Sequence, residues 1–128
     1  MPLHLDLEQA PESARRARRA VRAFVLETLP ADGAVTEDLA DDAELVTSEL
    51  VTNAVRHGAA PVSLDVDALV EHERLVVTIV SRDGGSWDTS AAHEDGGRGL
   101  HLVQALSTEL RLDNDGPGTT VAVRLERA

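Results

Sequence analysis

With 128 residues, 42% of them hydrophobic, the chain is long enough for one ordinary domain with a single core and too short for two. The formal net charge of −11 and the aromatic content of 2% argue against nucleic acid as a direct partner, because phosphate is repelled and bases have little to stack on. All twelve basic residues are arginine and no cysteine occurs, which excludes phosphate-binding lysines, disulfides and thiolate metal sites.

Neither a membrane span nor a secretory leader is predicted. No apolar run approaches the roughly 18 residues that a spanning helix needs. The first residues, Met1 to Asp6, lack a basic start followed by an apolar stretch. We therefore expect a cytoplasmic protein without membrane contact, folded as one domain over residues 1–128.

The first 58 residues predict one strand and two helices. Leucines alternate with polar residues from Leu3 to Leu7, as in a half-buried edge strand. An apolar stripe at helical spacing runs from Glu12 to Leu29 and ends at Pro30. A second helix is predicted from Glu37 to His57, with Gly58 as its C-terminal stop.

The remainder predicts two hairpins separated by a loop and a short helix. Residues 62–68 alternate, and Leu75 to Val80 is a continuous apolar run, so together they predict a hairpin closed by residues 71–73. Residues 81–98 are rich in Gly, Ser and Asp and predict a loop. The last elements are a helix near 99–106, strands near 109–112 and 119–125, and a turn at 114–118.

The predicted order is strand, two helices, two strands, loop, helix and two strands. Helices grouped apart from hairpin-forming strands are typical of an α+β fold. We expect a two-layer sandwich in which helices cover one face of a mostly antiparallel sheet.

The second predicted helix carries a group of polar side chains on one face. Glu49, Asn53 and either Arg56 or His57 recur at helical spacing. An amide oxygen is a plausible anchor for Mg²⁺, an arginine can meet phosphate charge, and a carboxylate can orient or deprotonate a hydroxyl. Taken alone, such a face is more often simply solvated.

Two glycine-containing segments offer ligand contacts. Asp83-Gly84-Gly85 follows a buried strand, where a carboxylate can accept from an exocyclic amine and glycines let a flat ring approach. Gly96-Gly97-Arg98-Gly99-Leu100 precedes a helix, whose unpaired amides favour an anion such as triphosphate. Each alone is a weak signal, since Asp-Gly turns and flexible loops are common.

The order of these segments resembles one known family. Residues 49–58 closely resemble the N-box of the histidine-kinase-like ATPase superfamily, which has the Bergerat ATP-binding fold. Residues 83–85, 97–100 and 118–121 resemble its three glycine boxes. The N-terminal arginine-rich helix is similar to that of the anti-sigma-factor serine/threonine kinase branch, so the likeness covers nearly the whole chain.

The resemblance implies roles for individual residues. Asn53 would bind Mg²⁺, Glu49 would act as the base, and Asp83 would hold the adenine amine. Thr119 or Thr120 would assist Asp83, and Thr120 is the favoured candidate. The other residues that would contact ATP are Arg56, His57, Gly85, Gly97, Arg98, Gly99 and Leu100.

The resemblance also implies partners and leaves two functions open. Members of the branch transfer the ATP γ-phosphate to a serine of a small anti-anti-sigma protein with a STAS domain, and otherwise sequester a sigma factor. The alternative is a non-catalytic, ATP-gated binding module in which ATP only orders the lid, between Ser86 and Gly96, and partner exchange is the output. Strand 3–7 or the first helix could support a homodimer, as in relatives.

Two departures from the family pattern concern the first glycine box and the segment after it. Trp87 follows Ser86, where the family usually has a second glycine. The acidic residues Asp88, Glu94 and Asp95 raise the electrostatic cost of binding a triphosphate unless Mg²⁺ screens them. A metal site built from the scattered histidines 57, 72, 93 and 101 is disfavoured, because their spacing follows no known ligand pattern.

Overall fold

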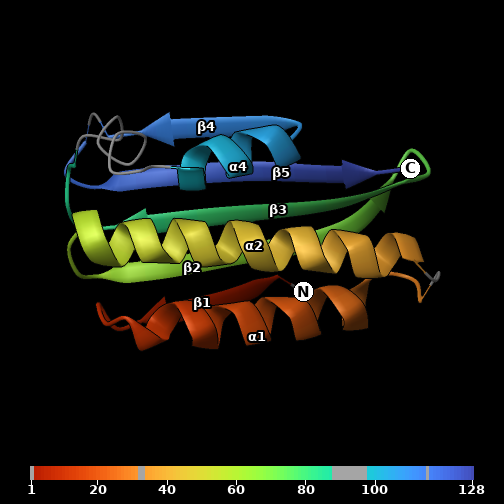
Figure 1. Ribbon diagram of the computed structural model, residues 1–128, viewed down its shortest axis with the longest axis horizontal. Helices are drawn as coiled ribbons and strands as arrows, with labels where there is room; N and C mark the ends of the chain where they lie inside the picture. The colour runs from red at the N-terminus through yellow and green to blue at the C-terminus, as the bar shows by residue number, and fades with distance from the viewer. Residues whose placement is uncertain (1, 32–33, 88–97, 115) are drawn as a thin grey trace.

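The computed structural model describes residues 2–31, 34–87, 98–114 and 116–128 (Figure 1). The elements in chain order are β1 (Leu3–Leu7), α1 (Glu12–Thr28), α2 (Ala34–His57), β2 (Val62–Glu71), β3 (Arg74–Asp83), α4 (Arg98–Leu106), β4 (Glu109–Asp113) and β5 (Thr119–Arg127). Every predicted helix and strand is present, with its ends shifted by up to three residues.

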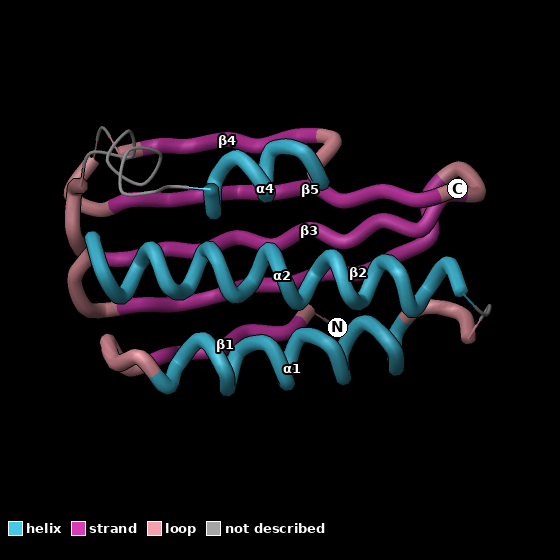
Figure 2. Tube along the Cα trace, in the orientation of Figure 1, coloured by secondary structure: helices cyan, strands magenta, loops and turns pink. Residues whose placement is uncertain are grey.

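The strands form one five-stranded sheet in the order β1-β2-β3-β5-β4, and every neighbouring pair is antiparallel. The helices of the described residues lie on one face of this sheet, as Figure 2 shows. The predicted α+β two-layer sandwich is thereby confirmed, and β1 lies at the edge, as its alternating pattern indicated.

Helix α2 crosses the middle of the sheet and buries one stripe along its length. Its buried residues recur every three or four positions, including Leu39, Val46 and Leu50, each at most 1% exposed. Full burial of such a side chain contributes about 1.5–3 kcal/mol relative to exposure. The sheet supplies Leu64, Ile79 and Leu125 to the same core, so the position of α2 is set along its whole length.

Arginines of α1 hold that helix against α2. Arg22 pairs with Asp41 at 2.6 Å, and Arg18 donates to the hydroxyl of Ser48 at 3.3 Å. Part of the basic face of α1 is therefore used within the molecule. Among the described residues, no helix has both the length and the apolar character needed to cross a membrane.

The sequence prediction ended the third strand too early. Residues 81–83 were predicted as loop, but they pair with β2 or β5 as the last residues of β3. Ser81 and Asp83 are buried despite their polarity. They continue the strand because ladder hydrogen bonds are made by main-chain groups, whatever the side chain. At the other end of the hairpin, His72 and Glu73 both adopt positive φ, as a two-residue type I′ turn requires.

Candidate functional site

Three segments meet at one end of the sheet. The C-terminal end of α2, the end of β3 and the start of β5 lie together there, on the left side of Figure 1. Asp83 is the last residue of β3 and is 7% exposed. It lies opposite Thr119, the first residue of β5. The predicted adenine-binding carboxylate is thus buried at the junction of these segments.

The charge of Asp83 is balanced by hydrogen bonds from three donors. Oδ1 accepts from the main-chain N–H of Gly85 at 2.8 Å and from that of Ala59 at 3.3 Å. Oδ2 accepts from the indole Nε1–H of Trp87 at 2.9 Å. A buried carboxylate requires such donors, because leaving it unpaired would be costly.

Glycines allow the three segments to approach the carboxylate. A Cβ on Gly58 would collide with the side chain of Asp83, and a Cβ on Gly118 would collide with its main-chain oxygen. A Cβ on Gly85 would lie 2.9 Å from the main-chain nitrogen of Ala59. Gly58 was predicted only as a helix stop, but it also makes room for Asp83.

The preference for Thr120 as the partner of Asp83 is not supported by the strand register. Asp83 pairs with Thr119, whereas Thr120 pairs with Arg82 and so lies on the other face of the sheet. Thr119 is 1% exposed and donates its hydroxyl to the carbonyl of Gly85 at 2.7 Å. Thr119 is therefore the threonine that shares the junction with Asp83.

Gln9 is a residue of this region that sequence reasoning missed. Its side chain donates to the carbonyl of Gly58 at 2.8 Å and accepts from the N–H of Ala60 at 3.2 Å. Gln9 thereby bonds to the residues before and after Ala59, and the N–H of Ala59 itself donates to Asp83. No local pattern marks Gln9, because it acts about fifty positions away in the chain.

Trp87 and Asn114 were also missed as parts of the site. The side-chain amide of Asn114 donates to the main-chain carbonyl of Trp87 at 2.9 Å. The main-chain carbonyl of Asn114 accepts from the hydroxyl of Ser86 at 2.8 Å. The sequence indicated Trp87 only as a departure from a glycine pattern. In the structure it is 9% exposed and packs in the hydrophobic core.

On α2, Glu49 and Asn53 are half-buried and lie one turn apart beside the buried stripe. Within the described part of the chain, Nδ2 of Asn53 is buried and has no hydrogen-bond partner. An unpaired buried N–H donor suits a ligand that accepts hydrogen bonds, such as a phosphate oxygen. The side-chain oxygen of the same amide, Oδ1, is the atom that would ligate a hard cation such as Mg²⁺.

Arg56 and His57 form the last turn of α2. Arg56 is exposed, and the half-buried ring of His57 stacks on the indole of Trp87, with ring centroids 5.4 Å apart and the planes tilted by 31°. His57 therefore faces the Asp83 junction. Its predicted contact with a ligand stays a prediction.

The second glycine segment is described only in part. Gly97 lies outside the described residues, whereas Arg98 and Gly99 form the first turn of α4. Leu100 is fully buried among core residues, so its side chain serves packing and only its main chain is left to meet a ligand. Helix α4 packs against α2, which brings this segment to the same helix as Glu49 and Asn53.

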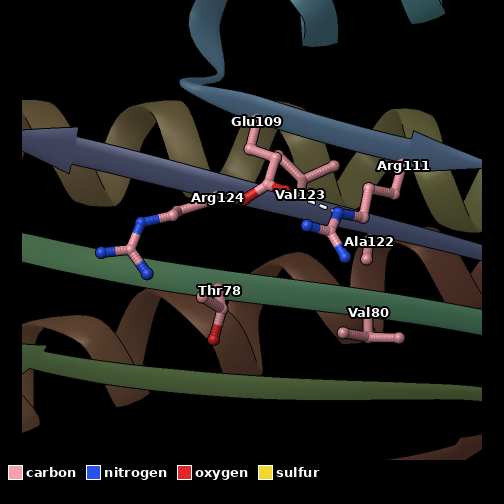
Figure 3. A pocket seen from close by; sticks show the side chains of 7 residues that line it. All are labelled: Thr78, Val80, Glu109, Arg111, Ala122, Val123 and Arg124. Atoms are coloured by element: carbon pink, nitrogen blue, oxygen red, sulfur yellow. Dashed lines mark hydrogen bonds and ion pairs between the residues drawn. The ribbon is translucent and has the colours of Figure 1, made fainter.

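A shallow hollow of about 290 Å³ lies elsewhere, on the sheet face that the helices do not cover (Figure 3). It is lined by Thr78, Val80, Glu109, Arg111, Ala122, Val123 and Arg124. None of these is a predicted site residue. In the described ranges, no three His, Cys, Asp or Glu side chains are grouped so that they could hold a metal ion.

Comparison with known proteins finds one matching family and structures with a similar fold. Residues 7–125 match the family described as histidine kinase-like ATPase domain. The structure of the RsbU and RsbW domains of Rv1364c from Mycobacterium tuberculosis is similar, with a TM-score of 0.67 and 23% identity over 99% of this chain and 32% of that one. The histidine kinase domain of a blue-light activated histidine kinase from Erythrobacter litoralis gives a TM-score of 0.50 and 24% identity over 90% and 59% of the two chains. The present chain thus spans about a third and about three fifths of these structures, and the likeness shows a shared fold.

Proposed function

The chain belongs to the family of histidine kinase-like ATPase domains, and we propose on this premise that it binds ATP and transfers the γ-phosphoryl group to a serine or threonine of a protein partner. The proposed partner is a small anti-anti-sigma protein with a STAS domain, and a sigma factor is the protein sequestered otherwise. The likeness in fold to a structure that includes a domain named RsbW supports this branch of the family.

The observation that carries the proposal is the junction around Asp83. A buried carboxylate, a threonine and closely approaching glycines lie together there, with His57 stacked beside them. A carboxylate accepts hydrogen bonds only, so it would select a base with an amino donor, as adenine has. The glycines would let the flat ring approach the main chain.

The α2 side chains would act at the other end of the nucleotide. Glu49 is half-buried on α2, one turn before Asn53, and its carboxylate would act as the general base. The partner hydroxyl would give its proton to Glu49 while its oxygen bonds to the γ-phosphorus, and the bond from that phosphorus to the β,γ-bridging oxygen would break to release ADP. Bound Mg²⁺, held by Asn53, would neutralise charge on the phosphates.

Asn53 and Glu49 would then have separate roles, binding and proton transfer. Because the two residues are one helical turn apart on a helix packed along its length, their relative position is maintained without help from a loop. Positioning and electrostatic stabilisation are the main protein contributions to phosphoryl transfer.

The second candidate function is an ATP-gated binding module without transfer. It would use the same junction around Asp83, because such a module requires ATP binding and no proton transfer. In this case ATP would change partner affinity only.

The two functions are separated by incubating the protein with γ-labelled ATP, Mg²⁺ and a candidate STAS-domain protein. We expect label on one partner serine or threonine, and loss of label when that residue is replaced by alanine. Glu49→Gln should lower the transfer rate about 100-fold or more, since general-base catalysis contributes 10²–10⁴-fold. ATP binding by calorimetry should change little.

The matched control is Glu37→Ala, an exposed glutamate in the first turn of the same helix. It lies twelve positions from Glu49, about 18 Å along the helix axis, and should leave transfer unchanged. ATP binding without transfer to the partner supports the module instead, and transfer at an unchanged rate in Glu49→Gln rejects Glu49 as the base.

A further inference from the structure

Trp87 contacts Asp83, Thr119 and His57, three residues that the proposed function places around adenine. Its indole Nε1–H donates to Oδ2 of Asp83 at 2.9 Å, and its main-chain N–H donates to the hydroxyl of Thr119 at 3.4 Å. The same indole stacks on His57. Three predicted ligand contacts are therefore made by one residue of the chain itself.

The indole resembles a purine in the properties that this junction recognises. Both are flat, fused two-ring systems with an N–H donor at one edge, and both can stack on an imidazole. Asp83 is 7% exposed, and its other oxygen is used by Gly85 and Ala59. A purine amine would therefore have to reach Oδ2, and the buried indole of Trp87 lies against that oxygen.

We propose that Trp87 is an internal competitor for the purine site and sets the affinity for nucleotide. This inference rests on the proposed ATP function and deepens it by naming the residue that limits binding. With the indole on Asp83 the site does not accept a purine, and with the indole displaced it does. The apparent dissociation constant then equals the intrinsic constant divided by the fraction of molecules with the indole displaced.

The contacts of Trp87 favour the arrangement in which the indole is bonded to Asp83 over the one in which it is displaced. The indole bond is made to a charged acceptor, a class that is stronger than a neutral pair, and Asn114 holds the carbonyl of Trp87 at 2.9 Å. Removing the indole donor should therefore raise the affinity for ATP by about tenfold, the factor that corresponds to 1.4 kcal/mol.

The unmodified protein provides the first test, because Trp87 is the single tryptophan and tyrosine is absent. The fluorescence emission of the protein therefore reports the surroundings of the Trp87 indole. On titration with ATP and Mg²⁺ we expect a red shift and increased quenching by acrylamide, as the indole leaves a site where it is 9% exposed. Calorimetry on the same samples measures binding independently of the fluorescence.

Trp87→Phe provides the second test. Phenylalanine keeps a ring beside His57 but lacks the N–H that reaches Asp83. We expect it to bind ATP about tenfold more tightly, with circular dichroism verifying its fold. If this variant does not fold, the fluorescence of the unmodified protein still decides.

The outcomes separate the inference from the function on which it rests. ATP binding by calorimetry with unchanged emission, unchanged quenching and no gain in Trp87→Phe overturns the competitor role and leaves ATP binding intact. Absence of ATP binding in both proteins overturns the proposed function and this inference together. A red shift with a tighter Trp87→Phe complex supports both.

Discussion

Three hydrogen-bond donors contact the carboxylate of Asp83, and they determine which of its two oxygens a ligand would have to reach. Its oxygens accept from two main-chain amides and one indole. The two amides bind Oδ1 and fix the orientation of the carboxylate, whereas the indole covers Oδ2. One oxygen is therefore structural and the other is the one that a ligand would have to reach.

A separate carboxylate, Asp65, acts on the open face of the sheet. Asp65 accepts from Arg82 at 2.8 Å and lies 2.6 Å from Nδ1 of His4. The other ring nitrogen of His4, Nε2, lies 3.0 Å from the carboxylate of Asp6. The hydrogen bond to Asp65, followed by that to Asp6, raises the pKa of His4 above its ordinary value of 6.5. This network ties the edge strand β1 to β2 and β3.

The raised pKa of His4 predicts a pH dependence of stability. The folded state holds the His4 proton more tightly than the unfolded chain, so the stabilisation is complete below about pH 6.5 and is lost as the pH rises through the raised folded pKa. Urea unfolding over this range should show that the unmodified protein loses its advantage over His4→Gln as the pH increases. As a control, a proton NMR titration of Asp65→Asn should show a lower pKa for His4 than in the unmodified protein. A His4 pKa at or below 6.5 in the unmodified protein would contradict the prediction.

At the scale of elements, the candidate site depends on a close approach of α2 and β3. Gly58 ends α2 with its N–H bonded to the carbonyl of Ala54 at 3.0 Å, and its Cα faces the carboxylate of Asp83. Gly118 brings the start of β5 against the same residue. The packing of these elements thus brings the end of α2 and the start of β5 against one residue, Asp83.

Gly58→Ala should disturb this junction. The added methyl group collides with Asp83, and such overpacking costs about 1–3 kcal/mol. We expect a lower free energy of unfolding in urea and weaker ATP binding. The matched control is Gly116→Ala, where an added Cβ has nothing within 4 Å, so equal loss in both variants would show that the effect does not come from the junction.

At the scale of the whole molecule, charge opposes the proposed ligand. The formal net charge is −11, and a triphosphate adds further negative charge to the complex. Interactions across the surface are screened over about 8 Å at physiological ionic strength, so local compensation by a cation is needed where the phosphates lie. We therefore predict that Mg²⁺ would supply a larger part of the free energy of ATP binding than in a basic protein.

This argument predicts a strong effect of magnesium on thermal stability. ATP at 100 times its dissociation constant adds about 2.7 kcal/mol to the free energy of unfolding, which corresponds to a rise in melting temperature of roughly 10 °C. We expect most of this rise to disappear when a chelator replaces Mg²⁺. Asn53→Ala is the control for the metal ligand, and an equal rise with and without Mg²⁺ would argue against the assigned role of Asn53.

Local sequence determined the elements and the helix-borne part of the site. Alternation predicted β1 and β2, the apolar stripes predicted α1 and α2, and the helical period placed Glu49 one turn from Asn53. These features depend on residues close together in the chain, whose spacing follows from the geometry of a single helix or strand.

Only the tertiary structure decided which distant residues meet at Asp83. A shift of one residue in the register of β5 would exchange Thr119 for Thr120 at this position, and no local pattern distinguishes the two. Gln9 and the indole of Trp87 reach the junction for the same reason: their contacts arise from the packing of separate segments. The sequence alone thus determined the elements and the motif-bearing helix, whereas the identity of the groups around the carboxylate required the sheet to be assembled.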